Sequence, residues 1–314
     1  MKTDRIKDLV TLDDWPVEWI REVLDLGCAL KREPDRWAKA MDRKTLCMIF
    51  EKPSLRTRIS FETAMTQMGG HAIYYDLNGS PLAAGKETIE DTAKVLSRFV
   101  NGIMARLFRH EVIEALAAHS TVPVINGLTD YSHPTQILAD LMTVVEHKGE
   151  LRGLKLAFLG DGCNNVTHSL LSGCAKVGMH IRIGCPQSPE AMPDPIAITR
   201  AEGFARESGA RIEITHDAKA AVKDADVVYT DSWMSYHIPA AKLAQRIALF
   251  TPFQVNADLM RCASPTAIFM NCLPAQRGYE QTAEVIDGPQ SVVFDQAENR
   301  LHAHKAILVR LLSP

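Results

Sequence analysis

Short apolar runs alternate along the chain with longer segments in which apolar residues recur at helical spacing. In the first part, strand-like runs cover residues 46–53, 71–77, 102–107 and 122–128, and helical spacing covers 54–69, 87–100 and 110–120. In the second part, strands are expected over 154–162, 181–186, 212–216, 226–231, 253–256 and 267–274, with the clearest helix over 164–178. This repetition predicts parallel sheets with helices on both faces.

A long helix expected over 134–149 interrupts the alternation and separates two runs of comparable size. The predicted fold is therefore α/β, with two doubly wound domains, each a parallel sheet flanked by helices, linked by a long helix. The domains are expected over 1–133 and 150–297, with 134–149 as the linker. An amphipathic final helix, 298–314, is expected to complete the first domain.

Composition narrows the class of protein. The 314 residues are 46% hydrophobic and 23% charged, with a formal net charge of −3, which is typical of a globular protein and not of a nucleic-acid or anionic-membrane binder. No apolar run approaches the about 20 residues of a membrane span, and the first ten residues lack a signal-peptide core. We expect a soluble, cytoplasmic protein with no membrane and no nucleic-acid partner.

The seven cysteines are odd in number, scattered and without a CxxC pair. Disulfide frameworks and zinc sites need clustered, even sets, so neither a disulfide nor a metal site is expected. Six of them are interpreted as small buried apolar residues, and Cys272 is kept as a candidate for chemistry.

Polar residues follow several of the predicted strands. Residues 53–58, PSLRTR, place Ser54, Arg56 and Thr57 where a strand gives way to a helix, whose free N–H groups and partial positive charge favour phosphate. The segment is not a P-loop, and a capped helix followed by solvated arginines is an alternative reading. Arg106, and His133 with Gln136, follow two further strands. One sheet edge would then gather donors suited to an oxyanion beside a polar carbonyl.

Three segments together resemble the signatures of the aspartate/ornithine carbamoyltransferases. They are Ser54-Leu55-Arg56-Thr57-Arg58, His133-Pro134-Thr135-Gln136 and Asn271-Cys272-Leu273-Pro274. Two more resemble the ornithine branch of that family, namely Asp231-Ser232-Trp233-Met234-Ser235, and Gly160-Asp161-Gly162 with Asn164-Asn165. The resemblance runs from end to end of the chain.

The resemblance implies an enzyme that moves the carbamoyl group of carbamoyl phosphate to the side-chain amine of L-ornithine, without a metal or organic cofactor. The first domain would bind carbamoyl phosphate and the second the amino acid. The residues implied to bind carbamoyl phosphate are Ser54, Leu55, Arg56, Thr57, Arg106, His133, Gln136, Cys272, Leu273 and Arg300. Those implied to bind ornithine are Asn165, Asp231, Ser235 and Tyr236, and the catalytic set is Cys272, Asp231, Arg106, His133 and Arg300.

The implied roles follow the charges of the substrates. Cationic donors would stabilise the charge that develops on the carbonyl oxygen and then on the departing phosphate. Asp231 and Asn165 suit the α-ammonium group of an amino acid, and Ser235 suits its α-carboxylate. The attacking amine must first lose a proton, since an alkylammonium has a pKa of about 10.4, and Cys272 is the family's candidate to take part in that transfer.

The resemblance also implies features beyond the residues that bind substrate. The Leu273–Pro274 peptide is expected to be cis, which would aim the leucine carbonyl into the site. The loop around Lys86 is lent to a neighbouring subunit in relatives, which implies a homotrimer with active sites near subunit interfaces, although a solvated loop lysine is an equal reading. Arginine biosynthesis is the pathway suggested, and arginine breakdown is an open alternative because both use one reaction.

Three positions depart from the family pattern. Asn271 replaces the usual histidine, and an asparagine cannot carry a proton. Tyr236 and His237 stand where the ornithine branch has methionine and glycine, which adds two rings beside the amino-acid pocket. Leu55 replaces a common threonine, which removes one hydroxyl near the phosphate.

The departures leave other functions open. A transferase of the same family could act on putrescine, an acylated ornithine or a diamino acid, and a catalytically silent relative is a further alternative. As a separate hypothesis, His237 restores the proton relay lost at Asn271. A nucleotide-binding dehydrogenase is the rival suggested by residues 156–165, LAFLGDGCNN, but Asn165 stands where the third glycine of that fingerprint belongs.

Overall fold

The computed structural model describes residues 7–234 and 238–313. The chain divides into two compact units, one made of the residues up to Met142 and from Glu298 onward, the other of Thr143–Ala297. Within the described residues, no helix is both long and apolar enough to cross a bilayer.

The first unit is a parallel four-stranded sheet in the order β2-β1-β3-β4. Its strands are β1 (Thr45–Phe50), β2 (His71–Asp76), β3 (Gly102–Arg106) and β4 (Val124–Leu128). Its helices are α1 (Val17–Arg32), α2 (Leu55–Gln67), α3 (Ile89–Phe99), α4 (His110–His119) and the greater part of α5 (Pro134–Lys148) and α12 (Val293–Leu312). Short 3₁₀ turns occupy Pro34–Trp37 and Leu77–Gly79.

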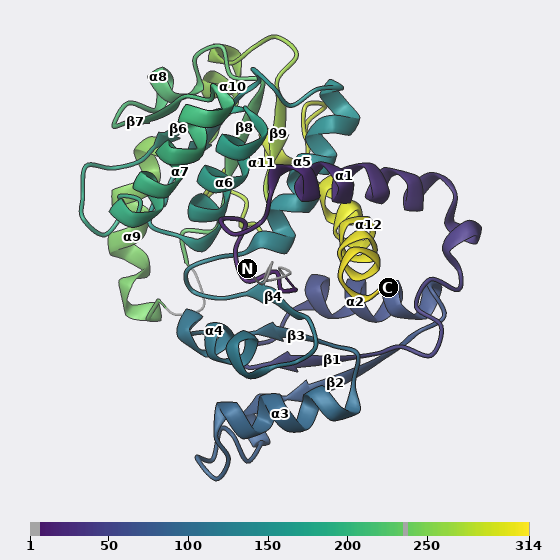
Figure 1. Cartoon of the computed structure of the whole chain (residues 1–314). Coiled ribbons are helices and arrows are strands. Elements are labelled where there is room, and N and C mark those ends of the chain that lie inside the picture. The colour runs from purple at the N-terminus through teal and green to yellow at the C-terminus, as the bar shows by residue number, and fades with distance from the viewer. Residues whose placement is uncertain (1–6, 235–237, 314) are drawn as a thin grey trace. The chain divides into compact units, whose positions relative to one another are not determined.

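Strand residues of the first sheet alternate between two apolar layers. Cys47, Ile49, Ile103 and Ala105 are buried in one core with residues of α3 and α4. The helices α2 and α12 lie on the opposite side of the sheet from α3 (Figure 1). This distribution is that of a doubly wound sheet, in which the chain reverses its direction of travel between β1 and β3. The ends of β1 and β3 are therefore where a ligand is expected.

The second unit is a parallel five-stranded sheet in the order β7-β6-β5-β8-β9. Its strands are β5 (Lys155–Leu159), β6 (His180–Gly184), β7 (Ile212–Thr215), β8 (Val227–Thr230) and β9 (Ile268–Met270). Its helices are α6 (Asn165–Val177), α7 (Pro195–Ser208), α8 (Ala218–Val222), α9 (Leu243–Phe250), α10 (Ala257–Cys262) and α11 (Ala283–Ile286), with 3₁₀ turns at Ala240–Lys242 and Thr251–Phe253. Here the reversal falls between β5 and β8, and the prediction of two doubly wound sheets is confirmed.

Two local predictions differ from the structure, and one helix was missed. The strand expected over 253–256 is wrong, because a 3₁₀ turn ends at Phe253 and Asn256 already caps α10, which leaves only a single bridge from Val255 to Gln281. The final helix begins at Val293, before the expected residue 298. The helix α1, which buries Ile20, Val23, Leu24 and Leu30 on one face, was not predicted.

Candidate active site

The segment after β1 starts a helix in the way the sequence predicts. Ser54 is the N-cap of α2, and its hydroxyl oxygen accepts a hydrogen bond from the Thr57 backbone N–H at 3.3 Å. Leu55 is 73% exposed, so only its backbone is suited to hold an anion. The guanidinium of Arg56 is half-buried and makes no hydrogen bond or ion pair within residues 7–234 and 238–313. The start of α2 therefore offers backbone N–H groups together with an uncompensated cation.

The Thr57 hydroxyl joins the cationic residues of the first unit. It accepts hydrogen bonds from Arg106 Nη1 at 3.4 Å and from Arg300 Nη2 at 3.1 Å, and Arg300 Nη1 donates to Gln136 Oε1 at 2.5 Å. The four side chains are all buried, and they come from α2, β3, α5 and α12. The structure thus brings together residues up to 243 positions apart that the sequence predicted for one site.

His133 directly precedes α5 and is fully buried, with a hydrogen bond of 3.4 Å between its Nδ1 and the hydroxyl of Thr135. Burial, and then the positive charges of Arg300 and Arg106, hold the pKa of His133 well below its usual range. The ring is therefore neutral at neutral pH. It can give a hydrogen bond to a carbonyl oxygen, but it adds no positive charge to the arginine pair.

Several partners of these residues were missed in the sequence. Asp140 accepts a hydrogen bond from Gln136 Nε2 at 2.8 Å, and His304 accepts one from Arg300 Nε at 3.4 Å. Both lie four residues after the side chain that they contact, so helical spacing was the available signal. Lys52, with its Nζ 4.6 Å from the centre of the Phe108 ring, is also buried, and burial followed by the charge of Arg106 lowers its pKa to about 8.

In the second unit, Cys272, predicted to take part in proton transfer, lies within hydrogen-bond distance of Asp231, predicted to pair with the α-ammonium group. Cys272 follows β9 and Asp231 follows β8, and the Cys272 thiol donates to Asp231 Oδ1 at 3.0 Å. Asn165 is the first residue of α6 after β5. Since β5, β8 and β9 are neighbours in the sheet, these three residues all lie at its carboxyl edge. Cys272 and Leu273, although predicted to bind carbamoyl phosphate, belong to this unit and not to the unit of Arg106.

Two of the predicted ornithine-binding residues, Ser235 and Tyr236, lie outside the described residues, as does His237.

The residues around Cys272 have an unusual backbone. The Leu273–Pro274 peptide is cis, as predicted, and Leu273 has a φ of 56°, in the left-handed region that a leucine rarely occupies. Asn271 Oδ1 accepts a hydrogen bond from the Leu273 N–H at 2.8 Å, and its Nδ2 donates to Gln281 Oε1 at 3.1 Å. Asn271 is fully buried. It thus holds the turn after β9, a role that does not require a titratable side chain.

Trp233 lies two residues after Asp231, and both its backbone N–H and its backbone carbonyl are hydrogen-bonded to side chains. Glu280 Oε1 accepts a hydrogen bond from the Trp233 N–H at 3.3 Å, and the Trp233 carbonyl accepts one from Arg246 Nε. Arg246 also pairs with Asp161, and both side chains are buried. The pKa of Asp161 is raised to about 6, chiefly by burial, against the opposing effect of Arg246. Neither Arg246 nor Glu280 was predicted, because each is distant in sequence from the motif that it supports.

The glycines after β5 have a packing role. A Cβ atom added to Gly162 would lie 2.6 Å from the Ala191 carbonyl oxygen and 3.0 Å from Pro193. The open side of this glycine is therefore filled by the chain's own backbone, whereas a dinucleotide fingerprint leaves it open for a pyrophosphate. The geometry does not favour the dehydrogenase alternative.

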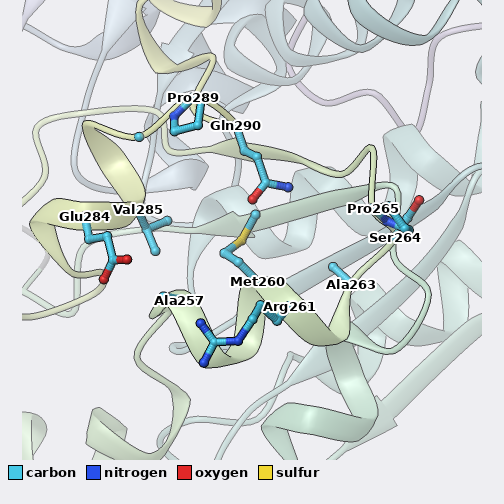
Figure 2. A pocket seen from close by; sticks show the side chains of 11 residues that line it. Ala257, Met260, Arg261, Ala263, Ser264, Pro265, Glu284, Val285, Pro289 and Gln290 are labelled. Carbon is cyan, nitrogen blue, oxygen red and sulfur yellow. The ribbon is translucent and has the colours of Figure 1, made fainter.

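A surface hollow of about 470 Å³ lies elsewhere on the second unit, between the α10 and α11 segments (Figure 2). Its lining includes Met260, Arg261, Glu284 and Gln290, and none of the predicted site residues. Arg261 forms an exposed ion pair with Asp258. Among the described residues, no group of three or more His, Cys, Asp or Glu side chains is placed to hold a metal ion.

Comparisons with known proteins show which family the chain belongs to. The model of the aspartate/ornithine carbamoyltransferase carbamoyl-P binding domain matches residues 7–146, and that of the Asp/Orn binding domain matches residues 152–311. The chain therefore belongs to the aspartate/ornithine carbamoyltransferase family.

Within the family, the similar proteins are ornithine carbamoyltransferases by name. The anabolic enzyme of Pyrococcus furiosus is 49% identical over 308 residues, which cover 98% of this chain and 96% of that relative. The enzyme of Symbiobacterium thermophilum is 47% identical over the whole of both chains. Among solved structures, the P. furiosus enzyme has a TM-score of 0.92 at 49% identity, with 98% of this chain and 97% of that chain covered. The Giardia lamblia enzyme has a TM-score of 0.90 at 41% identity, with 98% and 99% covered.

Proposed function

We propose that the chain transfers the carbamoyl group of carbamoyl phosphate to the side-chain amine of L-ornithine, which yields citrulline and phosphate. The observation that carries the proposal is the meeting of Arg106 and Arg300 at the Thr57 hydroxyl. Thr57 and Arg106 lie in the residues that match a carbamoyl-P binding domain. The full-length similarity to ornithine carbamoyltransferases supports ornithine as the acceptor.

In this proposal the first unit handles the donor. Ser54, Arg56, Thr57 and the first N–H groups of α2, with that of Leu55 among them, hold the phosphate. Arg106 and Arg300 stabilise the charge that passes from the carbonyl oxygen to the leaving phosphate. The neutral ring of His133 gives a hydrogen bond to the carbonyl oxygen, which favours attack at the carbon and adds no third positive charge to Arg106 and Arg300. Gln136 contacts the carbamoyl group, with its amide fixed by Asp140.

The second unit handles the acceptor. Asp231 pairs with the α-ammonium group of the amino acid, joined by Asn165, Ser235 and Tyr236. Cys272 lies against the Asp231 carboxylate and steers the side-chain amine, which attacks once it is neutral. The Leu273 carbonyl, held by Asn271 through the Leu273 N–H, accepts a hydrogen bond from the carbamoyl NH₂.

The test is carbamoyl-phosphate-dependent release of phosphate with a panel of amines: ornithine, putrescine, acetylornithine and lysine. Ornithine is expected to give the highest kcat/KM. Arg106→Met and Arg300→Met should each lower it about 10²–10³-fold, because each removes a preorganised charged donor. Arg109→Met is the control, since Arg109 is exposed and pairs only with Glu111 among the described residues. A preference for another amine would overturn the assignment of ornithine as the acceptor. No turnover with any amine would overturn the proposal as a whole.

We also propose that the chain acts as a homotrimer in arginine biosynthesis, in the cytoplasm. Large apolar side chains are exposed around the edge strand β2 and the adjoining helices α2 and α3: Leu55, Ile59, Ile73, Tyr74, Val95 and Phe99. An unpaired edge strand with exposed apolar neighbours suits contact with another copy. Lys86 is exposed in the loop before α3, where a neighbouring subunit could use it. The seven cysteines are free thiols, as a reducing compartment requires.

Sedimentation equilibrium tests the trimer. Phe99 is 76% exposed in the single chain, so Phe99→Asp should leave folding intact while it weakens assembly about tenfold or more, because a carboxylate would be buried without a partner. Phe294→Asp is the control, because Phe294 is similarly exposed but belongs to the second unit. A single-chain mass for the unchanged protein would contradict the proposal.

A further inference from the structure

His304 is a fully buried histidine one helical turn after Arg300 on α12. Its Nε2 lies 3.4 Å from Arg300 Nε, and its Nδ1 lies 2.8 Å from the hydroxyl oxygen of Ser60 on α2. The ring stacks on Phe61, with centroids 3.8 Å apart and planes inclined by 14°. The imidazole is thus held at both nitrogens and on one face.

The surroundings select one tautomer of this ring. Guanidinium nitrogens only donate, so the contact with Arg300 requires Nε2 of His304 to accept. The proton then lies on Nδ1 and is donated to the Ser60 hydroxyl oxygen. The Ser60 hydroxyl in turn donates to the Arg56 carbonyl oxygen at 2.5 Å. Burial and the Arg300 charge also keep the pKa of His304 well below its usual range, so the ring stays neutral.

These contacts connect the Arg300 guanidinium to the backbone carbonyl of Arg56 through one directional chain of hydrogen bonds. Arg300 donates to His304, His304 to Ser60, and Ser60 to the backbone of Arg56. Arg300 uses its three guanidinium nitrogens on three acceptors, which are His304, Gln136 and Thr57. Three acceptors in fixed positions determine the rotation of a planar guanidinium, which two alone would leave looser.

We propose that His304, with Ser60, is a positioning residue that sets the orientation of the Arg300 guanidinium for carbamoyl phosphate, as its neutral Nδ1–H tautomer. The inference rests on the proposed function, because it gives Arg300 its role in donor binding. His304 acts through Arg300 and needs no contact with substrate.

Steady-state kinetics with both substrates varied test the proposal. His304→Phe keeps an aromatic ring on Phe61 but removes the acceptor for Arg300. It should lower kcat/KM for carbamoyl phosphate about tenfold, the loss expected for one hydrogen bond to a charged group, while KM for ornithine changes less than about twofold. His304→Gln restores an acceptor near the Nε2 position and should recover a large part of the loss.

His302→Phe is the matched control. His302 lies on the same helix, and its Nε2 contacts Glu298 at 3.4 Å. Equal values of kcat/KM for carbamoyl phosphate in His304→Phe and His302→Phe would overturn the inference. If the unchanged protein transfers no carbamoyl group, the proposed function fails instead, and the tautomer measurement below still decides the state of His304.

The tautomer is read by ¹⁵N chemical shifts of the intact protein labelled at histidine, with the His304 signals assigned by their loss in His304→Gln. At pH 7 we expect a protonated Nδ1 and an unprotonated Nε2. Ser60→Ala removes the acceptor of the Nδ1 proton with little risk to folding, since alanine favours helices, and should broaden or shift that signal. A charged ring, or a proton on Nε2, would overturn the proposal.

Discussion

Asn271 shows how a single residue can keep a turn in place without taking part in proton transfer. Its amide bonds the Leu273 N–H and the Gln281 side chain, and its backbone N–H donates to Gln296 Oε1 at 3.0 Å. The family's usual histidine at this position can also titrate, whereas an amide cannot. The Cys272 thiol here contacts Asp231, and the amide of Asn271 cannot carry a proton to or from it.

Replacement of Asn271 by leucine tests this role. Asn271→Leu leaves two buried polar partners unpaired and should lower the free energy of unfolding by about 2–4 kcal/mol. Turnover should fall because the Leu273 carbonyl loses its support, while the shape of the pH–rate profile stays the same. Urea unfolding and the pH profile are the measurements.

The control for this prediction is Asn256→Ala, which removes an N-cap of α10. It should cost about 1 kcal/mol of stability and leave turnover unchanged. A pH profile displaced in Asn271→Leu would contradict the assignment.

At the scale of elements, the loop after β8 is a support for the acceptor residues. Trp233 lies between Phe250 and Tyr279, with ring centroids 5.8 and 6.5 Å away, and Glu280 and Arg246 fix its peptide atoms. Since Asp231 is two residues earlier in the same loop, the orientation of its carboxylate depends on this support.

A substitution of Arg246 tests whether its contacts with Asp161 and Trp233 orient the Asp231 carboxylate. Arg246→Lys keeps a cation near Asp161 but cannot hold both Asp161 and the Trp233 carbonyl with a planar fork. We expect KM for ornithine to rise about tenfold while KM for carbamoyl phosphate changes less than about twofold, equivalent to the loss of one charge-assisted hydrogen bond. Arg261→Lys, an exposed pair with Asp258, should change neither constant. Equal increases in both Michaelis constants would contradict the role.

The sequence predicted the strands and helices wherever apolar spacing was long and regular. It also placed Thr57, Arg106 and Gln136 correctly at the end of one sheet, because the carboxyl ends of parallel strands share an edge. The strand expected over 253–256 failed because its apolar residues pack from a turn and not from a ladder. Periodicity does not distinguish the two over four residues.

The residues that hold the predicted site residues in place could not be predicted from apolar spacing or from strand ends. Arg246 and Glu280 contact Trp233 from 13 and 47 positions away, and nothing in their local sequence points to that contact. His304 and Asp140 have a weak signal in their spacing from Arg300 and Gln136, but the same spacing occurs on any helix. Tertiary packing decides which of these pairs meet.

At the scale of the whole molecule, the most deeply buried ionisable groups of the two units are expected to change stability in opposite ways in acid. In the first unit, the pKa values of His133 and His304 are lowered chiefly by burial, so the unfolded chain binds protons first as the pH falls below about 6.5. Their contribution to stability is complete above that pH and is lost on acidification. In the second unit, the pKa values of Asp161 and Glu280 are raised chiefly by burial, so their contribution grows as the pH falls toward their unfolded values.

Hydrogen exchange of the intact protein at pH 7 and pH 5.5, corrected for intrinsic rates, checks this difference. Protection in the sheet of the first unit should fall, at up to about 1.4 kcal/mol per pH unit for each buried histidine, while that of the second unit is retained. Each unit also contains a group that acts in the opposite direction: burial raises the pKa of Asp8 in the first unit and lowers that of the less buried His180 in the second. His304→Gln should reduce the loss in the first unit. Equal losses in both units would contradict the assignment of these groups.

The hydroxyl of Thr57 has one further consequence. Arg106 and Arg300 donate to both lone pairs of the hydroxyl oxygen, so toward a ligand this hydroxyl can only donate a hydrogen bond. A guest that needs an acceptor at that point, such as an ammonium ion or an amide N–H, finds none. The direction of this one O–H bond therefore favours ligands that place an oxygen acceptor at Thr57, independently of the attraction between their charge and the arginines.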